Sequence, residues 1–66
     1  MSQLYDLKIR IEEKIKSDDL DGTDVRGRIG LKSGRLLAFI NPNTPDDPDG
    51  IAKLKRAAKE VLNLSL

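Results

Sequence analysis

The chain has 66 residues, of which 38% are hydrophobic, 35% charged and 3% aromatic. This length allows one small domain, residues 1–66, and the composition is too apolar for a disordered chain. Twelve basic and eleven acidic side chains leave a net charge of +1, which predicts no strong overall attraction to nucleic acid or to a membrane. The sequence contains no histidine and no cysteine, which excludes imidazole and thiolate chemistry.

The sequence has no apolar run of the roughly 18 residues that a transmembrane helix needs. It also does not begin with basic residues followed by an apolar stretch, which is the pattern of a secretory signal peptide. We therefore expect a cytoplasmic protein that makes no membrane contact. No motif in the sequence indicates a cofactor.

Residues 3–17 are predicted to form an amphipathic helix. Ser2 precedes this stretch and is a favourable N-cap residue. An alternating strand pattern also runs from Tyr5 to Ile11, but Ile15 fits only a helix. Tyr5 and Ile9 form a second apolar patch on this helix. Four apolar side chains, spaced by three, four and four residues, fall within about 80° on its main face: Leu4, Leu7, Ile11 and Ile15.

Residues 25–31 and 36–40 are predicted to form the two strands of a β-hairpin. Both runs are rich in apolar side chains, and Ser33-Gly34 between them suits a tight turn. This turn pairs Leu31 with Leu36 and creates a core face: Val25, Ile29, Leu31, Leu36, Ala38 and Ile40. The opposite face combines two apolar side chains, Leu37 and Phe39, with four basic ones: Arg26, Arg28, Lys32 and Arg35.

Residues 48–63 are predicted to form the last helix. The segment 41–49 contains three prolines and is expected to be a loop. Asp47 followed by Pro48 is typical of a helix start, with an N-cap residue and then proline at the first helical position. The sequence therefore predicts an α+β fold of the order helix–β-hairpin–helix (αββα), in which the hairpin packs against the two helices.

The predicted core is thin, which favours association with a partner. A two-stranded sheet with two helices buries little apolar surface and leaves unpaired strand edges. Such a layer is too small to bury four further apolar side chains: Leu37, Phe39, Tyr5 and Ile9. We therefore predict a non-enzymatic protein-interaction or regulatory module. Its partner is a second copy of itself, as a homodimer, or another protein, and these four residues form the interface.

The basic face of the predicted hairpin suggests an alternative function. The hairpin would place four cations beside Phe39: Arg26, Arg28, Lys32 and Arg35. The cations of such a two-stranded ribbon suit phosphate binding, and the aromatic ring could stack on a base. Aspartates at the base of the hairpin would repel a polyanion. Weak nucleic-acid binding is therefore the second hypothesis.

Two groups of aspartates flank the predicted hairpin: Asp18, Asp19, Asp21 and Asp24 before it, and Asp46, Asp47 and Asp49 after it. All seven are expected to crowd the open end of the hairpin, where they either bind a hard cation or occupy turns and helix caps. Neither group has the spacing of a calcium loop, so no metal site is predicted. Glu12 and Glu13 point about 100° apart on a helix and cannot share a substrate, so no catalytic residues are predicted.

Overall fold

The computed structural model describes residues 2–66, which form three α-helices and one turn of 3₁₀ helix: α1 (Gln3–Ser17), α2 (Gly22–Ser33), η1 (Leu37–Phe39) and α3 (Pro48–Leu62). Residues 2–66 contain no β-strand, so the predicted αββα fold is wrong and this part of the chain is all-helical. The first and last helices lie where the sequence predicts them. The predicted strands 25–31 and 36–40 are instead α2 and a connection that contains η1.

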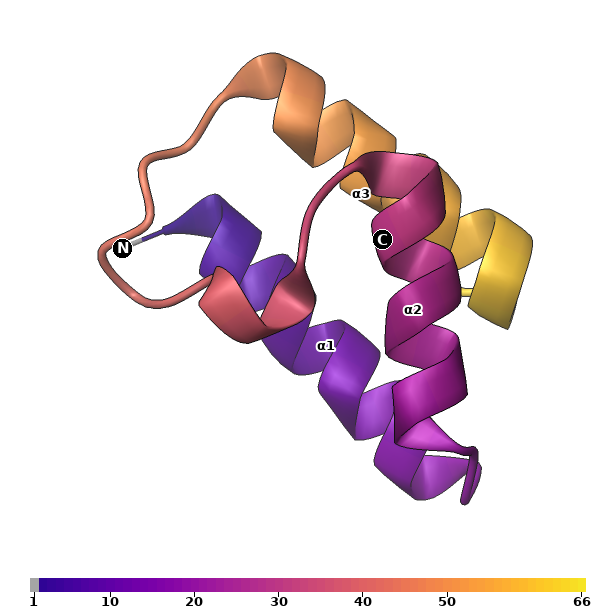
Figure 1. Ribbon diagram of the computed structural model, residues 1–66. Coiled ribbons are helices and arrows are strands. Elements are labelled where there is room, and N and C mark those ends of the chain that lie inside the picture. Colours follow the sequence, from indigo (N-terminus) through magenta and orange to yellow (C-terminus); the bar gives the residue numbers. More distant parts are fainter. Residues whose placement is uncertain (1) are drawn as a thin grey trace.

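Figure 1 shows how the helices are arranged. α1 and α2 form a V that closes at the short turn of residues 18–21, and α3 crosses behind α2. The connection from α2 to α3 descends to η1 beside the N-terminal half of α1 and then returns to the start of α3. The helices and the connection enclose one apolar core: Leu4, Leu7, Ile11, Ile15, Val25, Ile29, Leu37, Ile40, Leu54, Ala57, Ala58 and Leu62.

The ends of α1 follow local signals in the sequence. The Ser2 hydroxyl accepts a hydrogen bond from the Tyr5 N–H at 3.2 Å, so Ser2 is the N-cap, as predicted. Beyond the C-terminus, Asp19 adopts a φ of 52°, which turns the chain away from the helix. The four apolar residues of the predicted stripe are all buried: Leu4, Leu7, Ile11 and Ile15.

Helix α2 replaces the first predicted strand. Its N-cap is Asp21, whose carboxylate accepts hydrogen bonds from the N–H groups of Thr23 and Asp24 at 3.1 and 3.3 Å. Val25 and Ile29, four residues apart, are both buried. This spacing fits one face of a helix as well as one face of a strand, so these two residues alone do not distinguish the two structures.

The connection between α2 and α3 replaces the predicted turn and second strand. Gly34 has a φ of 69° and is the left-handed residue that ends α2, so it does not turn a hairpin. Residues 36–40 do not alternate as a strand would. Leu37 and Ile40, three residues apart, enter the core, whereas Phe39 faces solvent.

Asp47 and Pro48 start α3, as the sequence predicts. The Asp47 carboxylate accepts a hydrogen bond from the Gly50 N–H at 2.5 Å, and Pro48 is the first helical residue. The helix ends at Leu62, one residue before the predicted end, because Asn63 adopts the left-handed conformation with a φ of 54°.

Asp46 attaches the connection to the start of α1. Its carboxylate accepts hydrogen bonds from the N–H groups of Gln3 and Leu4 at 2.9 and 3.0 Å and from the Ser2 hydroxyl at 3.2 Å. The two N–H groups belong to the first turn of the helix, which leaves them without partners inside the helix. Because they stabilise the charged carboxylate, they lower the pKa of Asp46.

The Asp46→Asn variant should be less stable than the wild type at neutral pH, and this difference should vanish in acid. The folded-state pKa of Asp46 lies below its unfolded value near 3.8. Its contribution to stability is therefore present above that pH and is lost as the pH falls through the folded-state pKa. Urea unfolding from about pH 7 to about pH 2 should show the two free energies of unfolding converging.

Asp19→Asn is the matched control, because it removes an exposed carboxylate to which residues 2–66 donate no hydrogen bond. At neutral pH it should lose less stability than Asp46→Asn, because it removes no hydrogen bond. A constant difference between the wild type and Asp46→Asn over the whole pH range would contradict the role of the Asp46 charge.

Candidate functional site

Three large apolar side chains are exposed at the end of α2 and in the connection after it. Leu31 is 89% exposed, Leu36 63% and Phe39 74%. Leu36 and Phe39 line one hollow of about 370 Å³. The side chain of Leu36 also lies over Gly30, where an added methyl group would be 3.7 Å from Leu36 Cδ2. Leu31 is the next residue of α2 after Gly30, and we call the three exposed side chains of Leu31, Leu36 and Phe39 the apolar patch.

The local fold directs these side chains outward. The Phe39 N–H donates to the Leu36 carbonyl at 3.0 Å and closes the turn η1. This turn points Leu37 into the core, where it is 2% exposed, and leaves Leu36 and Phe39 outside. On α2, Leu31 lies about 160° around the helix from Ile29, the middle of the buried face, at 100° per residue.

The structure separates the four predicted interface residues. Leu37 packs in the core, so the prediction that it shares an outer face with Phe39 is wrong, because the hairpin that would pair their orientations does not form. Phe39 belongs to the apolar patch. Tyr5 is half-buried against the core, and Ile9 lines a groove between α1 and α2.

The four predicted nucleic-acid-binding residues do not form a common face. Arg26 extends from α2 towards α1, whereas Lys32 extends from α2 towards α3. Each of the four has its own carboxylate partner: Arg26 pairs with Glu12, Arg28 with Asp24, Lys32 with Glu60 and Arg35 with Asp47. The hairpin face that would gather them is absent from residues 2–66, and their charges are locally balanced.

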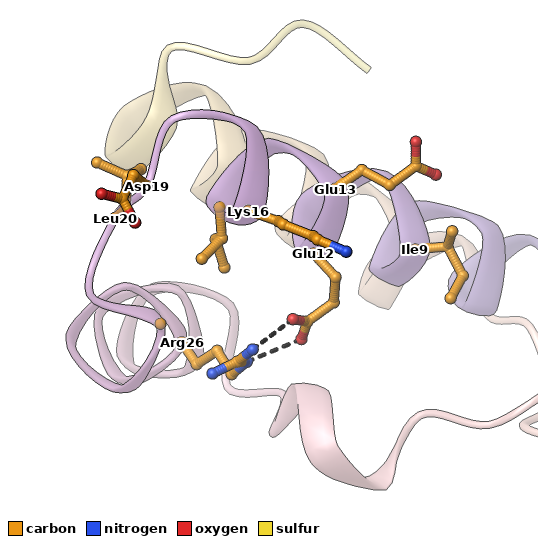
Figure 2. A pocket seen from close by; sticks show the side chains of 9 residues that line it. Ile9, Glu12, Glu13, Lys16, Asp19, Leu20 and Arg26 are labelled. Atoms are coloured by element: carbon orange, nitrogen blue, oxygen red, sulfur yellow. Dashed lines mark hydrogen bonds and ion pairs between the residues drawn. The ribbon is translucent and has the colours of Figure 1, made fainter.

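A groove of about 580 Å³ lies between the C-terminal half of α1 and the start of α2. Figure 2 shows Arg26 reaching across it to the Glu12 carboxylate, to which it donates two hydrogen bonds at 2.8 and 2.5 Å. Ile9 and Leu20 line the groove and are 37% and 40% exposed. Two partly exposed apolar side chains therefore lie on either side of a closed ion pair (Figure 2).

The ion pair in the groove carries fixed charges. The hydrogen bond from Arg26 lowers the pKa of Glu12, and the same bond raises the pKa of Arg26. Both shifts favour the charged form, as does the shift of Asp46. At neutral pH these side chains hold elements of the fold together and keep their protonation states.

The prediction that seven aspartates crowd one end of the molecule is wrong. Residues 18–24 form the turn between α1 and α2 and the first residues of α2, whereas Asp46 binds the opposite end of α1. The 15 residues of α1 separate the two groups by about 20 Å, at 1.5 Å per residue. Within residues 2–66, no three acidic side chains gather in an arrangement that could hold a metal ion. Asp21 and Asp47 instead cap α2 and α3.

None of the helices within residues 2–66 combines the length and the apolar character that are needed to cross a bilayer. Comparison of the chain with protein-family models, curated proteins and solved structures gives no significant match.

Proposed function

We propose that the protein is a small non-catalytic interaction module that binds a second copy of itself through the apolar patch. One observation carries this proposal: Leu31, Leu36 and Phe39 each expose most of their side-chain surface, and Leu36 and Phe39 line the same hollow. Single exposed leucines are common on soluble proteins, but adjoining apolar side chains that include an aromatic ring are typical of contact surfaces.

The charges around the apolar patch suit a second copy of the chain. Arg28 and Lys32 flank Leu31 on α2, and Arg35 lines the hollow of Leu36 and Phe39. Each of these three cations is paired with a carboxylate of the same chain. Two copies of the patch can therefore meet without bringing unpaired like charges together.

The small number of apolar side chains in the patch predicts a weak dimer. Specific interfaces of standard size bury about 800 Å² on each partner, which is a large share of the 4394 Å² that this protein exposes. Such an interface extends beyond three side chains and along the outer face of α2. There Gly27 leaves open space, because nothing lies within 4 Å of the position that a Cβ atom would take. We expect a dissociation constant in the micromolar range.

Light scattering over a dilution series tests the proposal. At high concentration the wild type should approach twice the 7.3 kDa mass of the chain, and it should return to the monomer mass on dilution. A double variant, Leu36→Ser with Phe39→Ser, removes two apolar side chains from the patch while leaving the core intact. It should remain monomeric at every concentration and keep the helical circular dichroism of the wild type.

The matched control is Ile9→Ser with Leu20→Ser, which removes two apolar side chains from the groove between α1 and α2. It should dimerise like the wild type. If the control loses the dimer and the patch variant keeps it, the interface lies at the groove and the patch proposal is wrong. A wild type that stays monomeric at millimolar concentration would exclude self-association, and a different protein would then be the partner of the patch.

A further inference from the structure

The ion pairs of the protein leave one helix face with unbalanced positive charge. Within residues 2–66, half of the basic side chains pair with a carboxylate: Lys14, Arg26, Arg28, Lys32, Arg35 and Lys53. The other half form no such pair there: Lys8, Arg10, Lys16, Lys55, Arg56 and Lys59. Three of these six cations lie within five consecutive residues of α3, so the charge is concentrated there.

Lys55, Arg56 and Lys59 share the outer side of α3, which we call the α3 face. At 100° per residue they fall within an arc of about 100°, and the small side chain of Ala52 lies among them. The acidic side chains of α3 lie outside this arc, and each already pairs with a lysine. Arg56 and Lys59 are exposed and Lys55 is half-buried, so all three can reach a ligand.

We propose that the α3 face binds the phosphate backbone of nucleic acid. Lysine and arginine side chains neutralise phosphates and release the counterions condensed on them, and this release drives the binding. The α3 face carries no aromatic ring to stack on a base, so its contacts are with the backbone and have little sequence preference. The four cations of the predicted hairpin face pair with carboxylates of the protein itself, whereas the three cations of the α3 face do not.

The buried side of α3 favours nucleic acid over an anionic membrane. Helices that lie in a membrane interface insert an apolar face between the lipids beside their basic residues. The apolar face of α3 is already in the core: Leu54, Ala57, Ala58 and Leu62 are all buried. The hollow beside Lys55 is lined by Asp6 and Arg10 of α1, which bring opposite charges, and also by Leu7, Ile9 and Leu66.

Fluorescence anisotropy with a labelled DNA duplex of arbitrary sequence tests the proposal. Three phosphate contacts predict that binding weakens about 40-fold between about 50 and about 200 mM salt. A triple variant should reduce this salt dependence to about threefold or less. It combines Lys55→Gln, Arg56→Gln and Lys59→Gln. Arg56→Gln alone, a milder change at an exposed position, should leave a dependence of about 12-fold.

The charge-matched control is Lys14→Gln, Lys16→Gln and Arg28→Gln, which removes three cations from other surfaces of the protein. It should keep the salt dependence of the wild type. Equal loss of binding in the two triple variants would mean that only net charge matters, and it would overturn the proposal. Failure of the wild type to bind the duplex at low salt would also overturn it, as would binding to vesicles rich in phosphatidylserine without binding to DNA.

Discussion

Leu37→Ala should lower the free energy of unfolding by about 2–5 kcal/mol, the usual cost of truncating a fully buried leucine. Leu37 is 2% exposed and brings the connection between α2 and α3 into the core. A loss of this size is comparable to the whole stability of many small domains. Thermal and urea unfolding followed by circular dichroism measure it. If Leu37→Ala does not fold at all, Leu37→Met, which conserves volume, should cost less than about 1.5 kcal/mol.

Phe39→Ala is the control for this prediction. Phe39 is 74% exposed, and its removal should change the stability of the monomer by no more than about 0.5 kcal/mol. A β-hairpin would place Leu37 and Phe39 on the same face, so both alanine variants would then have similar effects. Equal losses at the two positions would therefore contradict the turn η1, and a large difference would support it.

Gly34→Ala should lower the free energy of unfolding by about 1–2 kcal/mol. Gly34 ends α2 with a φ of 69°, and a Cβ atom in this left-handed conformation approaches the following carbonyl oxygen. The cost comes from the backbone alone, because nothing else lies within 4 Å of the position that the Cβ atom would take. The midpoint of urea unfolding measures the effect.

Gly27→Ala should change the stability in the opposite direction. Gly27 lies inside α2 and also has open space around its Cβ position. Alanine is favoured over glycine within a helix by about 1 kcal/mol, so this variant should be more stable than the wild type. Measured on the monomer, these two substitutions differ only in backbone conformation. A loss of stability in Gly27→Ala would contradict the helix that replaces the first predicted strand.

The first and last helices could be predicted because several local signals agree in each of them. For α1, the N-cap Ser2 and an apolar stripe that extends as far as Ile15 both indicate a helix. For α3, Asp47 and Pro48 mark the start, and the apolar periodicity continues to Leu62. These signals depend on neighbouring residues only, so the sequence is sufficient to locate them.

The middle of the chain could not be predicted because its local signals disagree. Gly27 and Gly30 weaken a helix, the β-branched Val25 and Ile29 favour a strand, and Ser33-Gly34 suits a hairpin turn as well as a helix end. Asp21, which caps α2, and the left-handed Gly34 are the signals that favour a helix. The two structures differ in which other residues enter the core shared with α1 and α3, namely Leu37 in place of Leu31 and Leu36, and this tertiary packing is not visible in a local pattern.

The predicted interface residues depended on the β-hairpin in the middle of the chain, so the candidate site changes when that segment is helical. Phe39, which is predicted to lie in an interface, is exposed on the single chain, whereas Leu31 and Leu36 are predicted in the core, because a strand places every second residue on one face. In a helix that buries Val25 and Ile29, Leu31 must face outward. Arg28 pairs with Asp24 four residues earlier in α2, but the ion pairs of Arg26, Lys32 and Arg35 join different elements, and only the three-dimensional arrangement identifies those three.

The attachment of Asp46 to the start of α1 affects the order in which the protein can fold during synthesis. The groups that it joins are 42 to 44 residues apart, and a ribosome releases the chain from its N-terminus. An isolated helix of 15 residues is only marginally stable in water. Until the connection has been synthesised, the N–H groups of Gln3 and Leu4 therefore lack the Asp46 carboxylate as their acceptor. The contacts of Leu37, Ile40 and Asp46 with α1 and the core therefore depend on a part of the chain that is synthesised after α1 and α2.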